Sequence, residues 1–228
     1  PRGAIRLPLE IVKAGQDFEA ALGKAIIKGD AAEDRSQGHA LGQNPELRAV
    51  QERFVSLANR NLSRLRDVLR KSADPDQRAL AAQVIAYVDN KEAIVRDLVQ
   101  AMHDPDADVR NNSMRALAVM ADFSHSSPKK RHIPATPFVE MLSSIEWTDR
   151  NKASFALLGL TADRDPKILS ELRARALTPL TEMARWKTPG HAQAAFALLG
   201  RIAGFSEERI LAAWNSGDRE AVIAAASR

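Results

Sequence analysis

The stretch "HDPDADVRNNSMRALAVMAD" at residues 103–122 decides the fold. It opens with an Asp-Pro turn signal and continues with small and apolar residues at helical spacing. Counted from an Arg, these residues lie at offsets three, six and seven, which fall on one face of a helix. The same spacing recurs in four segments, which are "RALAAQVI" from Arg78, "RNNSMRAL" from Arg110, "RNKASFAL" from Arg150 and "HAQAAFAL" from His191. Their intervals of 32, 40 and 41 residues are typical of repeats built from helical pairs.

The composition favours helices throughout the chain. Of 228 residues, 45% are apolar and only 5% are aromatic, and Ala is prominent wherever apolar residues cluster. Ala favours close-packed helices over strands. Ala or Ser at offset three also lets neighbouring helix backbones approach closely. We therefore expect an all-α fold in which the recurring faces are buried between neighbouring helices.

Each recurring helix is expected to follow a first helix of its own. Start signals precede the four recurring segments, at Asp74-Pro75, Asp104-Pro105, Thr148-Asp149 and Thr188-Pro189. Five further amphipathic stretches lie at residues 62–72, 91–103, 137–144, 167–186 and 207–217. The fourth contains Pro179, which should kink or split its helix one residue earlier. The pattern predicts about five helical pairs.

The stretch "LVQAMHDPDADVRNNSMRALAVMA" (residues 98–121) resembles a HEAT repeat of the bilin-lyase-like kind. Its matching residues are Asp104, Pro105, Val109 and Arg110, and Asp74, Pro75 and Arg78 match with a two-residue deletion. The resemblance covers roughly residues 45–226. It implies a right-handed α-solenoid of about five HEAT-like helical pairs with an N-terminal capping helix.

Two segments depart from the repeats. Residues 7–28 are amphipathic and residues 28–43 are polar and contain Gly, so we expect a capping helix followed by a loop or linker. This divides the chain into an N-terminal part, residues 1–43, and a repeat domain, residues 44–228. Residues 123–137 interrupt a repeat with a basic loop that carries Lys129, Lys130 and Arg131. That loop is either a docking element for an acidic partner or a solubilising insertion.

Charge and cysteine content bound the environment and the partners. The net charge of +4 is a small excess on a large molecule, so nucleic acid is an unlikely partner. The absence of Cys excludes disulfides and thiolate metal sites. No apolar run is long enough for a membrane span, and we expect a soluble monomer. The chain begins at Pro1 without Met, so either a leader has been removed or the sequence is trimmed, and cytoplasmic and exported locations both stay open.

The sequence carries no recognised catalytic signature. It lacks a Gly-rich phosphate loop, a G-x-S-x-G elbow and an H-E-x-x-H motif. His125 and His132 lie in the basic loop, where positive charge disfavours a metal ion, so no metal and no cofactor are expected. Trp147, Trp186 and Trp214 are expected to pack between pairs. An alternative places a DNA glycosylase site at "EWTD", residues 146–149.

Two sets of polar residues remain for tying repeats together or for meeting a partner. We expect a structural ladder that sets the stacking of the repeats, formed by Asp74, Arg78, Asp104, Arg110 and Arg150. The alternative is that these arginines face a ligand. Offsets one and five beyond each Arg lie opposite the packed face. If they line a concave face, a partner would meet Gln83, Asn111, Arg115, Asn151 and Phe155.

The prediction for function is a non-catalytic scaffold that binds another protein or a peptide along a concave face. Two alternatives stay open from the sequence. One is an enzyme or enzyme accessory, either a bilin-lyase-like chaperone of chromophore attachment or a HEAT-like DNA glycosylase. The other is a structural domain of a longer chain.

Overall fold

The structure, a computed structural model, describes residues 3–126 and 132–228. Within them it contains twelve helices and one short sheet. The elements of the N-terminal half are α1 (Leu9–Ile27), β1 (Glu33–Asp34), β2 (Leu41–Gly42), α2 (Pro45–Lys71), α3 (Pro75–Ile85), α4 (Glu92–Ala101) and α5 (Ala107–Ser126). Those of the C-terminal half are α6 (Thr136–Met141), α7 (Trp147–Leu160), α8 (Pro166–Arg175), α9 (Leu177–Ala184), α10 (Pro189–Ile202), α11 (Glu207–Ser216) and α12 (Arg219–Ala226). The all-α expectation is confirmed.

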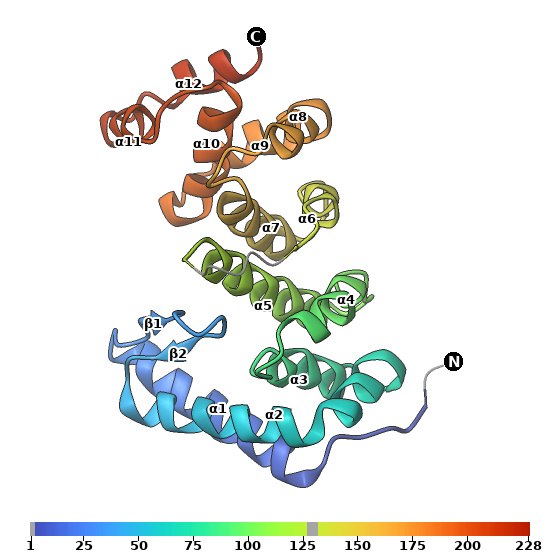
Figure 1. Cartoon of the computed structure of the whole chain (residues 1–228). Helices are drawn as coiled ribbons and strands as arrows, with labels where there is room; N and C mark the ends of the chain where they lie inside the picture. Colours follow the sequence, from blue (N-terminus) through green and yellow to red (C-terminus); the bar gives the residue numbers. More distant parts are fainter. Residues whose placement is uncertain (1–2, 127–131) are drawn as a thin grey trace. The chain divides into compact units, whose positions relative to one another are not determined.

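The chain divides into two compact units, Pro1–Arg131 (unit 1) and His132–Arg228 (unit 2). In unit 1, α3 and α5 lie side by side, with α4 on one flank and the β1–β2 hairpin on the other (Figure 1). In unit 2, α7 and α10 lie side by side, with α6 and α8 on one flank and α11 on the other (Figure 1). This division separates groups of residues that contact one another, whereas the sequence was divided by the type of segment. The boundary drawn at residue 43 from segment type stays a prediction, as does the handedness of the stacking.

The expected helical pairs are present in each unit. In unit 1 they are the second half of α2 with α3, and α4 with α5. In unit 2 they are α6 with α7, α8 and α9 with α10, and α11 with α12. The kink that separates the halves of α2 lies at Asn61, whose φ of −114° and ψ of 17° are not helical. Among the described residues, no helix combines the length and apolar character needed to cross a membrane.

The helix starts differ in part from the predicted ones. Asp74 caps α3 by accepting from the backbone N–H groups of Asp76 and Gln77. In the next repeat the cap is Asp106, which accepts from the N–H groups of Asp108 and Val109, so the predicted start at Asp104-Pro105 is wrong by two residues. The interval from Asp104 to Arg110 is two residues longer than the interval from Asp74 to Arg78, so the capping residue lies two positions further along the chain. Asp104 is left in the turn, where its carboxylate can meet another side chain.

One of the two starts predicted in unit 2 needs a similar correction. Helix α10 begins at Pro189 after Thr188, as the sequence predicts, although the Thr188 side chain makes no capping hydrogen bond. Helix α7 begins at Trp147, so Thr148-Asp149 lies inside its first turn. Ser144 instead accepts from the Glu146 N–H and donates to Asp149. Stretch 167–186 is split as expected, but the break lies at Ala176 and not next to Pro179. A Pro ring clashes with the carbonyl four residues earlier, which places the break up to a full turn ahead of it.

The carboxylate of Asp104 links two repeats of unit 1. Arg78, only 2% exposed, donates from Nε and Nη2 to the two oxygens of Asp104, each at 2.9 Å. Arg78 Nη1 also donates to the carbonyls of Ser72 and Ala73. Arg110 donates in the same way to the carbonyls at the same offsets, those of Asp104 and Pro105. Losing one partner of such a buried pair typically costs about 3–5 kcal/mol.

The seam between neighbouring second helices is formed by the residues at offset three. Ala81, Ser113, Ala153 and Ala194 are all fully buried. In unit 1 this brings α3 against α5, and in unit 2 it brings α7 against α10. A small side chain at this offset is therefore a packing requirement, as the sequence predicts.

Replacing Ala153 by Leu should overpack the seam between α7 and α10. We expect the free energy of unfolding to fall by about 1–3 kcal/mol because the extra methylene groups have no free volume to enter. The control is Ala174→Leu on the exposed side of α8, which should change it by less than about 0.5 kcal/mol. Urea unfolding of both variants provides the measurement. Equal stabilities for the two would contradict the assignment of offset three to the seam.

Candidate functional site

Each unit has a groove on its second helices, and the two grooves use the same repeat positions. The groove of unit 1, between α3 and α5, is lined by Gln83, Ala86, Tyr87, Asn112, Arg115, Ala116 and Val119. The groove of unit 2, between α7 and α10, is lined by Phe155, Leu158, Gln193, Ala194, Phe196, Ala197 and Arg201. Counted from Arg78, Arg110, Arg150 and His191, both sets fall mainly at offsets two, five, six and eight. The repeat thus places an opening at the same point of each unit.

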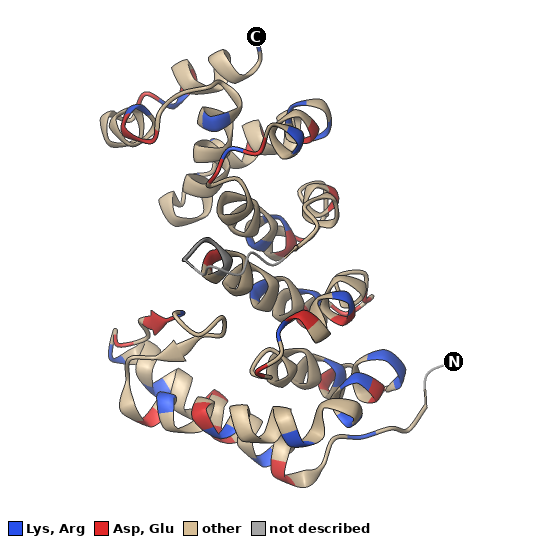
Figure 2. Ribbon diagram, viewed as in Figure 1, with Lys and Arg blue, Asp and Glu red and all other residues tan. Residues whose placement is uncertain are grey.

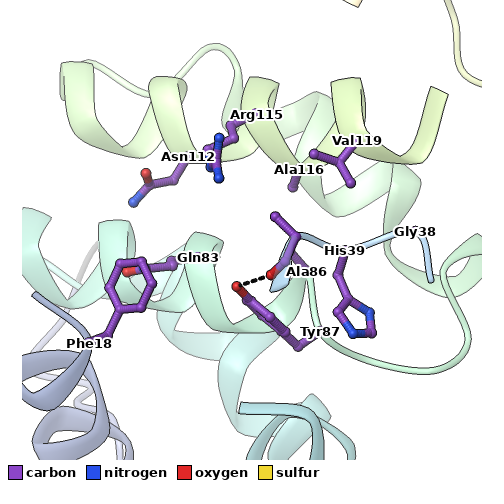
Figure 3. Close-up of a pocket in the computed structure, with 11 residues that line it drawn as sticks. Phe18, Gly38, His39, Gln83, Ala86, Tyr87, Asn112, Arg115, Ala116 and Val119 are labelled. Carbon is purple, nitrogen blue, oxygen red and sulfur yellow. Dashed lines mark hydrogen bonds between the residues drawn. The ribbon is translucent and has the colours of Figure 1, made fainter. Parts of the chain in front are cut away.

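The groove of unit 1 is filled by the chain itself. Gly38, His39 and Ala40, which precede β2, lie in it together with Phe18 of α1. Figure 3 shows Asn112 and Arg115 on α5 facing Gln83 on α3 and Tyr87 in the turn after it, with His39 beside Tyr87. The remaining cavity is only about 50 Å³. Segment 28–43, for which the sequence predicts a loop or linker, contains a two-residue hairpin, and its residues 38–42 are buried.

Hydrogen bonds and an ion pair hold this segment in place. Tyr87 donates its hydroxyl to the Ala40 carbonyl at 2.9 Å and accepts from Gln51 Nε2 at 3.0 Å. Gln51 Oε1 in turn accepts from the backbone N–H of Gly42. Arg115 forms an ion pair with Glu33 of β1. Burial raises the pKa of Tyr87 to about 12, so its hydroxyl stays protonated and able to donate.

A buried lysine anchors the turn of the same segment. Lys91 Nζ lies 2.9 Å from His39 Nδ1 and donates to the carbonyls of Ala86 and Val88. An ammonium group only donates, so His39 accepts at Nδ1 and carries its proton on Nε2. Burial and the nearby Lys91 charge lower the pKa of His39 to about 4. The His39 ring is therefore neutral at physiological pH.

The groove of unit 2 is open and apolar, with a cavity volume of about 380 Å³. Phe155 of α7 and Leu211 of α11 are 42% and 55% exposed, and Trp214 of α11 completes the wall. Ala194 and Ala197 of α10 also line it. Large half-exposed apolar side chains gathered around a hollow are typical of a binding surface.

Charged groups lie at one end of this groove and are paired with each other. Arg201 Nε donates to Glu207 at 2.9 Å, and Arg201 Nη1 donates to the Thr161 hydroxyl at 2.8 Å. The hydrogen bond from Arg201 holds the pKa of Glu207 below its ordinary value. Arg201 is the single charged residue of α10, which is tan along most of its length in Figure 2. The rest of the groove presents apolar atoms and the Gln193 amide.

The structure brings together some of the residues predicted to meet a partner. Gln83 and Arg115 share the filled groove of unit 1, and Phe155 lines the open groove of unit 2. Asn111 lines neither groove and donates to Asn112. Asn151 is nine-tenths buried in α7. Offset five therefore reaches both grooves, whereas offset one points away from them.

The structure describes the residues of the predicted ladder but not the three cations of the predicted basic loop. Arg78 and Asp104 pair with each other, while Asp74 caps α3 and lies 3.8 Å from Arg6. Arg150 forms a bidentate pair with Glu182 of α9, at 3.0 and 2.9 Å, within unit 2. The basic-loop residues Lys129, Lys130 and Arg131 lie outside the described residues. Among the described residues, no cluster of three His, Asp or Glu side chains could hold a metal ion.

Sequence reasoning missed Leu211 and Trp214, which form the third wall of the open groove. They lie three residues apart in "EERILAAWNSG", on a helix that also buries Ile210. The sequence signal that could have indicated them is the presence of apolar residues on two sides of one short helix, since one side alone is enough for packing. Each Trp contacts another helical pair. The ring centroids of Trp147 and His191 lie 4.8 Å apart and those of Trp214 and Phe196 lie 5.3 Å apart, while Arg150 covers the Trp186 ring.

Comparison with known proteins supports the repeat assignment in unit 1. Residues 62–131 match the family model of HEAT repeats. This HEAT region begins in the second half of α2 and takes in α3 to α5, including the pair of Arg78 with Asp104. No curated protein matches the sequence.

Solved structures of designed repeat proteins are similar to the chain at low identity. One is a computationally designed armadillo repeat protein for modular peptide recognition, with 17% identity and a TM-score of 0.49 over 81% of this chain and 93% of that one. Another is the designed armadillo repeat protein YIII(Dq)4CqI, with 16% identity and a TM-score of 0.49 over 85% and 97%. A third, YIII(Dq.V1)4CPAF in complex with peptide (KR)4, has 14% identity and a TM-score of 0.47 over 84% and 96%.

The buried His39 predicts how stability depends on pH. Its folded pKa of about 4 lies below the ordinary value of 6.5, so its contribution is complete above about pH 6.5 and is lost as the pH falls toward 4. Between about pH 7 and pH 4, the parent should lose up to about 3 kcal/mol more unfolding free energy than His39→Gln, whose amide oxygen can still accept from Lys91. Urea unfolding across this range measures both. Equal losses would show that His39 is not buried in its neutral form.

Proposed function

We propose that the chain is a non-catalytic scaffold that binds another protein or a peptide, and that the groove of unit 2 is the contact site. The observation that carries the proposal is the open apolar hollow beside Phe155, Leu211 and Trp214. The same repeat positions in unit 1 are occupied by polypeptide. The surface that the repeat forms on its second helices is thus one that accepts a chain segment.

Burial of apolar surface would drive such binding. Phe155 and Leu211 each leave about half of their surface in water, and covering apolar area contributes about 25 cal/mol per Å². An aromatic anchor in a water-excluding pocket commonly supplies much of the affinity of a protein interface. Because Arg201 and Glu207 neutralise each other at the end of the groove, an apolar anchor meets no unpaired charge there.

A charge placed in the groove tests the proposal. Twelve-residue peptides would be selected from a random phage-displayed library on the parent chain, and their affinities measured for Leu211→Asp. We expect at least about a tenfold loss, because the new carboxylate cannot stay hydrated beside a bound apolar side chain. The matched control is Ile145→Asp, also in unit 2, at a site that is 99% exposed and does not line the groove.

Two results would contradict the proposal. One is a selection that yields no peptide specific for the parent chain. The other is a set of peptides that bind Leu211→Asp and Ile145→Asp as tightly as they bind the parent. Urea unfolding of both variants checks that their folds are intact, which is expected because both side chains are largely exposed.

A further inference from the structure

We infer that the groove of unit 2 takes a non-helical segment of the partner polypeptide that inserts one large apolar side chain, in the position that residues 38–40 occupy in unit 1. The inference rests on the proposed function and adds the conformation and chemistry of the ligand. It follows from the equivalence of the grooves, from how unit 1 holds its own segment, and from the residues that differ between them.

The equivalence is positional and holds helix by helix. On the first helix of each groove, Gln83 of α3 and its C-cap residue Ala86 correspond to Phe155 and Leu158 of α7 at offsets five and eight. On the second helix, Asn112, Arg115 and Ala116 of α5 correspond to Gln193, Phe196 and Ala197 of α10 at offsets two, five and six. A segment seated between α7 and α10 would therefore meet the same helix faces as residues 38–40 meet in unit 1.

Unit 1 shows how these faces hold a chain segment. Residues 38–40 are not helical and form a bend that leads into strand β2, with Gly38 at a left-handed φ of 73°. Side chains bond to the backbone here, since Tyr87 donates to the Ala40 carbonyl and Gln51 of α2 accepts from the Gly42 N–H of β2. Backbone groups are open to side-chain partners in a non-helical segment, whereas a helix satisfies most of them internally. This mode of holding favours a non-helical ligand.

Unit 2 offers a side-chain amide for the same purpose. Gln193 occupies offset two, lies in the groove and is exposed. Its amide forms no hydrogen bond within the part of the chain that the structure describes. An amide has donors and an acceptor and can pair with either group of a peptide backbone. In unit 1 the residue at this offset, Asn112, donates to the Ala79 carbonyl and is already engaged.

The differences between the grooves select the side chain that enters. At offset five, unit 1 has Gln83 and Arg115, whereas unit 2 has Phe155 and Phe196. The cavity is about 380 Å³ in unit 2 and about 50 Å³ in unit 1. Leu211 and Trp214 of α11 add an apolar wall. A large aliphatic or aromatic residue fits this hollow, whereas the small Gly38 and Ala40 suit the narrow groove of unit 1.

The test uses the library-selected peptides that bind the parent chain and lose affinity on Leu211→Asp. Their conformation is read from the Cα chemical shifts of an isotope-labelled peptide in complex with the parent. We expect non-helical shifts around one large apolar residue, and at least about a tenfold loss of affinity when that residue is replaced by Ala.

The amide contact is tested by Gln193→Ala. One lost hydrogen bond should weaken these peptides about 3- to 10-fold. The matched control is Asn215→Ala, which removes an exposed amide from α11 outside the groove and should leave the affinity unchanged. Ala is a good helix former, so neither change should impair folding.

The outcomes separate this inference from the proposed function. Groove-dependent peptides with helical shifts, or with affinities unaffected by Gln193→Ala, would overturn the non-helical mode while leaving a peptide-binding groove. A parent chain that self-associates in sedimentation, and whose association is abolished by Leu211→Asp, would also overturn it, because the occupant would then be a second copy. If no groove-dependent peptide is obtained, the proposed function itself fails.

Discussion

The close approach of neighbouring second helices is the constraint on which both units depend. It requires a small residue at offset three, and Ala81, Ser113, Ala153 and Ala194 are all fully buried there. With the seam fixed, offsets five and eight must lie along its open edge, where the grooves form. A second close approach builds the wall of the open groove, since a Cβ on Gly200 would lie 2.5 Å from the Ile210 side chain. The groove of unit 2 is thus a consequence of backbone packing.

Arginines tie the repeats of unit 1 together from two sides. Arg78 spans from one turn to Asp104 in the next, which is possible because Asp106 has taken over the capping of α5. On the first helices, Arg66 and Arg70 of α2 both donate to the buried Asp97 of α4. A buried carboxylate is tolerated when it is paired and hydrogen-bonded. In the stretch 103–122, Asp104 and Asn112 therefore join neighbouring repeats, Arg110 donates within its own turn, and Arg115 holds the chain's own hairpin.

The sequence predicted the helices, the buried seam and the position of Phe155 opposite the packed face, because these follow from a spacing that repeats along the chain. It did not predict that residues 38–40 lie in the groove of unit 1. Strands of two residues are too short to show an alternation of apolar and polar residues, and the hydrogen bond from Tyr87 to Ala40 joins residues 47 positions apart. It also missed the wall formed by α11, since Leu211 and Trp214 belong to a helix outside the repeated pattern. Some helices begin a few residues away from the predicted start, because capping depends on which nearby carboxylate or hydroxyl reaches the free N–H groups.

Hydrogen exchange of the chain with and without a saturating library-selected peptide tests the central claim most directly, namely that the groove of unit 2 is the site where a ligand binds. Amides that line a filled groove should exchange more slowly because the ligand restricts local opening. We predict slowed exchange in α11 and the facing parts of α7 and α10, with no change at residues 33–42 or in α3. Slowed exchange confined to unit 1, with none in α11, would contradict it.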